Sequence, residues 1–354
     1  MKRRELLGAA VLAALPWRRL RAETGWRTFE VTTRAEISRP QGVSRAWLPV
    51  PMAGDMDWQR ALGNTWTGNA SRMEEVRVGK YGVSLLRAEW AAGEQAPWVE
   101  LKSRFSTRDR AVDLSRPGKA TSLSRGEIAL YTAPTEMIPC QGLIHETALV
   151  RVAKGARTDL EKGRAVYEWI VKNTLRDPKT RGCGTGNVKA MLESGNFGGK
   201  CADLNGLFVG FCRSLGVPAR DVYGVRVAGS ALGYKSLGAS SATISKAQHC
   251  RAEFFAEGFG WIPVDPADVR KVILEEPPGQ LKLEDPKVEA AHERLFGSWE
   301  MNWLAYNMGH DLDLPGAQGP RLPYLMYPNG ETGGERLDQL EPDAFKYSIT
   351  AREI

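Results

Sequence analysis

The stretch Gly198-Gly199-Lys200-Cys201-Ala202-Asp203-Leu204 decides the fold, because it joins a glycine-rich loop to an amphipathic segment. Apolar residues continue at helical spacing through Leu215, and Gly216 and Pro218 then end the pattern. The spacing predicts a helix that begins at Cys201. Free N–H groups and the helix dipole at such a position stabilise a thiolate and can donate to a developing oxyanion. Cys201 is therefore a candidate nucleophile, although cysteine is also a common buried packing residue.

His249, one of four histidines, opens a predicted strand that turns near Glu257-Gly258 and returns to Asp265. In a hairpin centred on residue 257, His249 is predicted to face Asp265 directly. A carboxylate at that place can accept the imidazole N–H, fix the tautomer and stabilise the imidazolium. His249 taken alone favours a structural role, but the pairing with Asp265 makes it a candidate general base.

The residues around these positions resemble the transglutaminase-like superfamily. The resemblance rests on residues 199–204 and 212–220 around the cysteine, and on residues 249–254 and 260–266 around the histidine and aspartate. The order is Cys, His, Asp, at intervals of 48 and 16 residues, and the resemblance spans about residues 155–270. It implies a papain-like α+β core with Cys201 as nucleophile, His249 as base and then acid, and Asp265 as its orienting partner. Arg251 stands where many members carry an aromatic, which affects the pocket floor or its charge preference.

The hydrophobic periodicity predicts an antiparallel β domain before this core, so the fold class is α+β. Residues 28–37 and 99–105 alternate as half-buried strands, and residues 76–78 and 83–90 flank a hairpin turn. We expect a β-rich domain over residues 23–138, a transglutaminase-like catalytic domain over 139–275 and a C-terminal extension over 276–354.

Further elements are predicted within the catalytic region and the extension. Thr158 and Glu161 form a capping-box pattern at the start of a helix. Strands are expected over residues 221–227, 250–255 and 261–264, a long loop and candidate lid over 228–247, and one helix around 288–306. Trp261, Trp299 and Trp303 are expected either in the core or along the cleft.

Residues 1–22 have the layout of an export signal, with Arg3-Arg4 ahead of a short apolar stretch. The arginine pair favours a twin-arginine leader, while a Sec signal and an uncleaved anchor stay open. The whole chain carries a net charge of +6, but removal of this segment leaves 42 basic and 41 acidic residues. The balance argues against a nucleic-acid partner. We expect an exported protein, periplasmic or secreted, that contacts membrane only through an uncleaved signal.

The five cysteines cannot all pair with one another, so the chain is not a pure disulfide framework. Cys212 lies about 16 Å along the helix from Cys201 and cannot bridge to it. Cys250 is expected to point away from the face of His249, and a pairing of Cys140 with Cys183 stays open. Asn196 and Gln248 are candidate side-chain helpers for the oxyanion, each with a structural role as the alternative.

Metal and serine-hydrolase chemistry have no matching motif. The histidines are scattered without metal-site spacing, and no G-x-S-x-G elbow occurs. We expect no metal and no cofactor. The resulting prediction is a thiol-dependent hydrolase of amide or peptide bonds in the cell envelope, acting on a peptide or protein amide through a Cys201 thioester. A protein cross-linker that uses an amine acceptor and a non-catalytic scaffold on the same fold are the alternatives.

Overall fold

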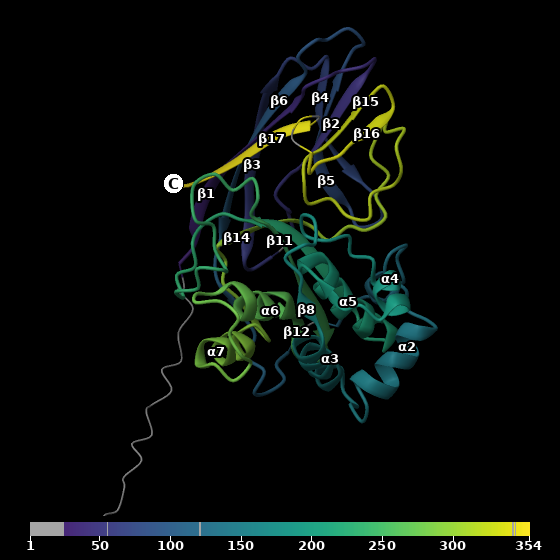
Figure 1. The fold of residues 1–354 in the computed structure, drawn as a ribbon, viewed down its shortest axis with the longest axis vertical. Coiled ribbons are helices and arrows are strands. Elements are labelled where there is room, and N and C mark those ends of the chain that lie inside the picture. Colours follow the sequence, from purple (N-terminus) through teal and green to yellow (C-terminus); the bar gives the residue numbers. More distant parts are fainter. Residues whose placement is uncertain (1–24, 55, 120–121, 342, 344) are drawn as a thin grey trace, which may run out of the picture.

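Two antiparallel sheets occupy one half of the molecule, and the helices surround a third sheet in the other half (Figure 1). The computed structural model describes residues 25–54, 56–119, 122–341, 343 and 345–354. The predicted α+β class, with a sheet region ahead of the core, is confirmed. The predicted export signal over residues 1–22 lies outside the described residues.

The first sheet has the strand order β17-β1-β6-β3 and includes both strands predicted from alternation. Its strands are β1 (Arg27–Ile37), β3 (Gln59–Gly68), β6 (Trp98–Thr107) and β17 (Phe345–Glu353). Every second residue of β1 is buried, and Phe29 pairs with Phe105 across the β1–β6 ladder. This alternation is why the sequence pattern identified both strands.

The second sheet has the order β16-β15-β2-β5-β4. Its strands are β2 (Ser44–Pro49), β4 (Arg72–Val78), β5 (Val83–Trp90), β15 (Asn329–Thr332) and β16 (Glu335–Leu337). The predicted hairpin joins β4 to β5, with Gly79 and Gly82 both in the left-handed region that the turn requires.

The end of the chain contributes strands to both of these sheets. Glu353 pairs with Phe29, and Asn329 pairs with Trp47. The segment after residue 276 therefore shares sheets with the segment before residue 138. The domain boundaries expected from the sequence stay predictions.

The third sheet, in the order β12-β11-β10-β14, carries the helices that position the candidate site. The elements are β10 (Ala219–Arg226), β11 (Gln248–Ala256), β12 (Gly260–Val264), β14 (Trp303–Asn307), α3 (Asp159–Asn173), α5 (Cys201–Ser214) and α6 (Pro266–Glu275). The predicted capping box of Thr158 and Glu161 starts α3. Phe208 of α5 packs on Phe254 of β11 in the largest apolar core. This packing holds α5 against β11.

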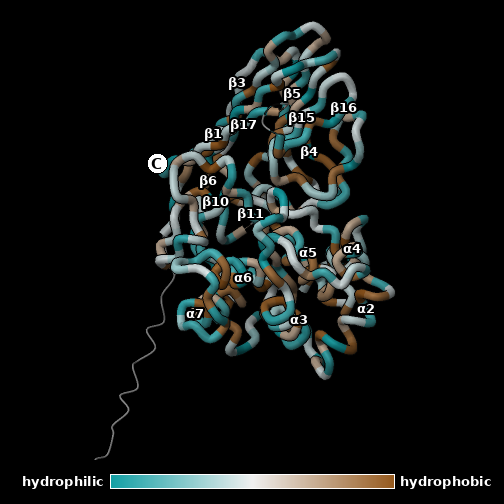
Figure 2. Tube along the Cα trace, viewed as in Figure 1, coloured by the Kyte–Doolittle hydropathy of each residue, from teal (hydrophilic) through white to brown (hydrophobic). Residues whose placement is uncertain are grey.

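Shorter elements complete the chain. They are β7 (Arg110–Ala111), α1 (Arg125–Thr132), α2 (Leu143–Thr147), the π-helical turn η1 (Ala148–Val152), β8 (Leu175–Arg176), α4 (Val188–Ser194), β9 (Gly198–Gly199), α7 (Pro286–Arg294) and β13 (Ser298–Trp299). Large hydrophobic side chains are exposed in α2 and η1, where Figure 2 shows hydrophobic segments at the edge of the molecule. No helix of the described part is long and apolar enough to cross a membrane.

The prediction of a single helix around residues 288–306 is wrong beyond Arg294. The helix α7 ends there, Gly297 adopts a left-handed conformation, and the chain continues as β13 and β14. All five residues of β14 are buried, so the apolar run has no alternation to distinguish a strand from a helix.

Candidate active site

Cys201 is the first residue of α5, as predicted, with its side chain in the apolar core. The preceding Gly198 and Gly199 form β9, which pairs with β8 and holds the loop against the sheet. A residue at this helical position has a main-chain N–H without an intrahelical acceptor. The arrangement therefore combines a thiol and a main-chain donor at one helix start.

Asp203, which the sequence analysis did not single out, fixes the loop in front of Cys201. Its carboxylate accepts from the main-chain N–H of Lys200 at 3.0 Å, Thr185 at 3.0 Å and Gly186 at 2.9 Å. A Cβ at Gly184 would collide with this carboxylate, so glycine is required there. Asp203 is the third residue of α5, and an acidic residue at this position is typical of a helix cap, so the sequence did contain a signal for this role.

His249 and Asp265 meet as predicted, but not through the predicted register. Nε2 of His249 lies 2.7 Å from Oδ2 of Asp265. The β11–β12 ladder pairs Ala252 with Val264 and closes at Ala256 and Gly260, so its register differs by two residues from the predicted pairing. Asp265 lies beyond the ladder as the N-cap of α6, and its side chain reaches His249 from there.

The hydrogen bond to Asp265 leaves Nδ1 of His249 as the imidazole nitrogen for Cys201. The pKa of the Cys201 thiol lies well below its ordinary value because the thiols of Cys183 and Cys250 hydrogen-bond to it and His249 adds a hydrogen bond and charge, outweighing burial. The arrangement favours a thiolate–imidazolium pair.

Asp268 is a second carboxylate at the imidazole, and the sequence analysis missed it. Its Oδ1 lies 3.5 Å from Nε2 of His249. Burial alone would lower the pKa of His249, but Asp268 and Asp265 outweigh burial and the opposing charge of Arg226, so this pKa is raised.

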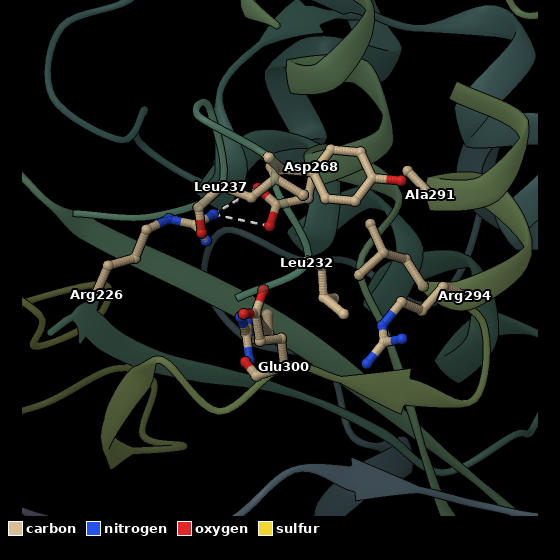
Figure 3. Close-up of a pocket in the computed structure, with 10 residues that line it drawn as sticks. Arg226, Leu232, Leu237, Asp268, Ala291, Arg294 and Glu300 are labelled. Atoms are coloured by element: carbon tan, nitrogen blue, oxygen red, sulfur yellow. Dashed lines mark hydrogen bonds and ion pairs between the residues drawn. The ribbon is translucent and has the colours of Figure 1, made fainter. Parts of the chain in front are cut away.

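Arg226 holds Asp268 in place from β10. Its Nη2 contacts Oδ1 and Oδ2 of Asp268 at 2.6 and 2.7 Å, as the dashed lines in Figure 3 mark. Despite burial, the charge of Arg226 lowers the pKa of Asp268, so Asp268 stays ionised. Leu232, Leu237 and Glu300 line the small cavity beside this ion pair (Figure 3). The loop over residues 228–247, a candidate lid in the sequence analysis, thus contributes to this cavity.

Among the described residues, His249, Asp265 and Asp268 form the group with donor atoms close enough together for a metal ion. The Arg226 guanidinium already occupies both oxygens of Asp268, and Asp265 accepts from His249, Asn205 and the main chain of Asp268. The Arg226 guanidinium is therefore the cation that balances these carboxylates. We assign Asp265 and Asp268 to the positioning of His249.

Two further residues contact Asp265. Nδ2 of Asn205, one helical turn after Cys201, donates to Oδ1 of Asp265 at 3.2 Å and to the carbonyl oxygen of Cys250 at 2.9 Å. Nε of Arg251 lies 3.6 Å from Oδ2 of Asp265, and burial lowers the pKa of Arg251 to about 10. Arg251 is packed against the Trp299 and Trp303 rings. Arg251 therefore contacts both Asp265 and the tryptophans of the core.

The two candidate oxyanion helpers differ in position. Asn196 is exposed, and its side chain accepts from the main-chain N–H of Gly198 at 2.9 Å, a loop-forming contact. Gln248 is buried directly before His249, and its Nε2 has no hydrogen-bond partner in the described part of the chain. Buried donors are normally paired, so this amide is available to a bound group.

The remaining cysteines include two at the site. All five cysteines are unpaired thiols, so Cys140 and Cys183 form no bridge. Cys250 packs in the core with Ala252 and Phe254, which alternate along β11 with His249 and Arg251, so it lies on the strand face opposite to His249 as expected. Its thiol still reaches the Cys201 sulfur, and burial raises the pKa of the Cys250 thiol well above the ordinary value.

The tryptophans expected either in the core or along the cleft divide between the two environments. Trp299 and Trp303 are fully buried, and the indole N–H of Trp303 donates to the carbonyl oxygen of His249 at 3.0 Å. Trp261 is partly exposed and packs edge-on against Tyr131. Trp303 therefore fixes the backbone of the candidate base.

The site is almost closed to solvent. Cys201 is 3% exposed and His249 is 4% exposed. Tyr324, from the segment before β15, stacks on Tyr223 and donates from its hydroxyl to the carbonyl oxygen of Gly184 at 2.5 Å. Tyr324 thus anchors the loop that contains Cys183.

Known proteins are similar to this chain over the segment that holds these residues. The sequence profile of the transglutaminase-like superfamily matches residues 146–266, which include Cys201, His249 and Asp265. An uncharacterized protein of Haemophilus influenzae is 33% identical over 344 residues, covering 92% of this chain and 91% of that protein. The crystal structure of a candidate cysteine protease from Cytophaga hutchinsonii aligns with a TM-score of 0.58 at 13% identity, covering 94% of this chain and 92% of that chain. The latter similarity shows a shared fold.

Proposed function

Because the chain belongs to the transglutaminase-like superfamily, we propose that it is a thiol-dependent acyl-transfer enzyme that hydrolyses amide or peptide bonds. The observation that carries the proposal is the placement of Cys201 at a helix start, with His249 hydrogen-bonded both to the Cys201 thiol and to Asp265. This set supplies a nucleophile, a proton carrier and an orienting carboxylate.

The reaction begins when the Cys201 thiolate attacks the substrate carbonyl carbon and forms a C–S bond. The main-chain N–H of Cys201 and the amide of Gln248 are the donors we assign to the resulting oxyanion. The imidazolium of His249 gives its Nδ1 proton to the leaving nitrogen, and the C–N bond breaks. A thioester on Cys201 and a free amine result.

Water completes the cycle. His249, now neutral, removes a proton from water as the oxygen attacks the thioester carbonyl. The C–S bond breaks, the carboxylic acid leaves, and the thiolate–imidazolium pair is restored. A protein amine in place of water would give a cross-link, and we favour water because it is abundant and the sequence has no calcium-loop pattern typical of regulated cross-linking.

The proposed substrate is a peptide or protein amide of the cell envelope. The envelope location rests on the export-signal layout of residues 1–22. Because Cys201 and His249 are nearly buried, substrate entry requires displacement of the Tyr324 hydroxyl from Gly184 or of the loop that this contact holds. The proposal therefore includes an opening step before acylation.

The first test is iodoacetamide labelling of the mature protein against pH, with the modified cysteine assigned by mass spectrometry. We expect fast labelling of Cys201 with an apparent pKa well below that of a free thiol, and loss of this labelling in Cys201→Ala. Cys140→Ala removes a different buried cysteine and serves as the matched control. Slow labelling typical of an unactivated thiol, or preference for another cysteine, would favour the scaffold alternative.

The second test separates hydrolysis from transfer. A peptide-amide library is incubated with enzyme in the presence and absence of a primary amine, and the products are identified by mass spectrometry. Hydrolysis gives the free carboxylate in both conditions, whereas a cross-linking enzyme gives the amine adduct when amine is present. Neither product should form with Cys201→Ala.

A further inference from the structure

Three thiols meet at the candidate nucleophile. The thiols of Cys183 and Cys250 both interact with the Cys201 sulfur, and Sγ of Cys183 also donates to the carbonyl oxygen of Gln248 at 3.2 Å. The backbone of Cys183 is also close, because its carbonyl oxygen accepts from the N–H of Ala202 at 2.9 Å and lies 4.0 Å from the Cys201 sulfur. The proposed hydrolysis uses only Cys201 as nucleophile, so the two neighbouring thiols form no bond in that reaction.

The backbone at Cys183 is better suited to form a bridge than the backbone at Cys250. Cys183 stands between Gly182 and Gly184, both in the left-handed region, in a loop without regular structure. Cys250 lies within β11, where it pairs with Tyr223 of β10 and its carbonyl accepts from Asn205. A disulfide requires sulfur atoms about 2.05 Å apart with a specific dihedral angle. A bridge at Cys183 requires movement of one loop, which the Tyr324 hydroxyl and the Asp203 carboxylate hold, whereas Cys250 would have to distort the sheet.

The reactivity of the sulfurs selects which one is oxidised first. The Cys201 thiolate is the activated sulfur, while the pKa of Cys183 is raised by its hydrogen bond to Cys201 and by burial. The thiolate is the form that reacts with peroxides, and a neighbouring thiol then resolves the product. The pair thus has the layout of a reactive cysteine beside a resolving cysteine.

We propose that Cys183 and Cys201 form a reversible disulfide that protects and inactivates the nucleophile under oxidising conditions. With hydrogen peroxide as oxidant, the Cys201 thiolate takes one oxygen to become a sulfenic acid and releases hydroxide. The Cys183 thiol then attacks this sulfur, the S–O bond breaks, an S–S bond forms and water leaves. A dithiol reductant restores both thiols by exchange.

The functional consequence rests on the proposed thiol-dependent activity, but formation of the bridge does not. A Cys201 sulfur held in a disulfide cannot attack a carbonyl, so oxidation would stop turnover until reduction. The bridge would also prevent further oxidation of Cys201 to the sulfinic acid, which is irreversible for most proteins.

The test is peptide mapping of the full mature chain after treatment with hydrogen peroxide, alkylation of free thiols and trypsin digestion without reductant. Trypsin separates the three cysteines, giving peptides 182–189 with Cys183, 201–213 with Cys201 and Cys212, and 247–251 with Cys250. We expect peptide 182–189 linked to 201–213, with fragmentation placing the bond on Cys201, and loss of the link after dithiothreitol.

Two variants isolate the resolving thiol. Cys183→Ser keeps a hydroxyl donor beside Cys201 but cannot form the bridge, so we expect sulfinic acid on Cys201 and at least a tenfold lower recovery of Cys201 labelling by dithiothreitol. Cys140→Ser removes a buried cysteine outside the cluster and should behave like the unaltered chain. A bond from Cys201 to Cys250, or reversible protection that persists in Cys183→Ser, would overturn the proposal. This mass readout is independent of whether any amide is hydrolysed.

Discussion

Oδ1 of Asp268 lies 3.5 Å from Nε2 of His249, on the same imidazole nitrogen that Asp265 bonds at 2.7 Å. The imidazole thus faces two carboxylates, one of which Arg226 keeps ionised. The thiolate–imidazolium pair exists above the pKa of Cys201 and below that of His249. By raising the pKa of His249, Asp268 extends this range at its alkaline end.

Replacement of Asp268 by asparagine should lower the pKa of His249. The physical reason is loss of the negative charge that contributes most to raising this pKa, while the charge of Arg226 stays. The measurement is a titration of ¹⁵N-labelled imidazoles by NMR, which the presence of four histidines makes tractable.

Glu275→Gln is the matched control, because it removes one acidic charge from the same helix at a residue bonded to Arg176. It should leave the pKa of His249 unchanged, because Glu275 is not among the charges that act on this imidazole. If the pKa of His249 is unchanged in Asp268→Asn, Asp268 has only a structural role.

The side-chain amide of Gln248 should speed the acylation of Cys201, which forms an oxyanion, and should not affect the alkylation of Cys201, which forms none. We expect Gln248→Ala to slow acylation by an activated ester about 10²-fold, within the range for a lost oxyanion donor. Iodoacetamide labelling, which forms no oxyanion, should change less than threefold. Both rates are followed by mass spectrometry of the intact chain.

Asn196→Ala provides the comparison, because its exposed amide bonds only to the loop at Gly198. Its acylation rate should stay close to that of the unaltered chain. Equal losses of acylation and alkylation in Gln248→Ala would instead indicate disruption of the loop around Cys183.

Glu276 should make stability depend on pH through the loop over residues 228–247. Its carboxylate accepts from the N–H groups of Lys235 and Ser236, at 3.1 and 2.9 Å, and from Lys287. These bonds overcome the effect of burial and lower its pKa to about 2. The stabilisation is complete above the unfolded-state pKa near 4.5 and is lost as pH falls toward 2.

Urea unfolding of the unaltered chain and of Glu276→Gln, at pH 6 and pH 3, measures this contribution. The difference in unfolding free energy between the two proteins should shrink at pH 3. A difference that is equal at both pH values would assign the effect to packing or to neutral hydrogen bonds.

Export should depend on the arginine pair if the leader uses the twin-arginine route. The double substitution Arg3→Lys with Arg4→Lys keeps the charge and should trap the precursor in the cytoplasm. Cell fractionation and immunoblotting measure the distribution. Normal export of the double variant would favour a Sec signal.

Local chemistry made Cys201 and His249 recognisable in the sequence. A glycine-rich loop followed by helical periodicity gave the start of α5, and the short strand expected over residues 250–255 lies within β11. The placement of Asp265 was predicted through a register two residues from the observed one. Its contact with His249 arises because the residue leaves the strand and caps α6.

The long-range contacts of the site had no comparable signal. Arg226 and Asp268 are 42 residues apart and belong to different elements, so neither periodicity nor spacing predicts their pairing. The loop position of Cys183 likewise depends on hydrogen bonds from its neighbours to Asp203. The addition of β17 beside β1 is a pairing between the two ends of the chain, which strand alternation alone cannot assign.

Gly163 of α3 should not tolerate alanine, because a Cβ there would overlap the ring of Phe254 on β11. Alanine normally stabilises a helix interior by about 0.5–1 kcal/mol relative to glycine. Overpacking a buried contact costs about 1–3 kcal/mol, so Gly163→Ala should destabilise the protein despite its better helix propensity. Gly126→Ala, in the exposed helix α1 with nothing closer than Ser124 Oγ at 4.0 Å, should be neutral or stabilising. Urea midpoints that move in the same direction for both variants would contradict the packing of α3 on β11, since helix propensity alone affects both alike.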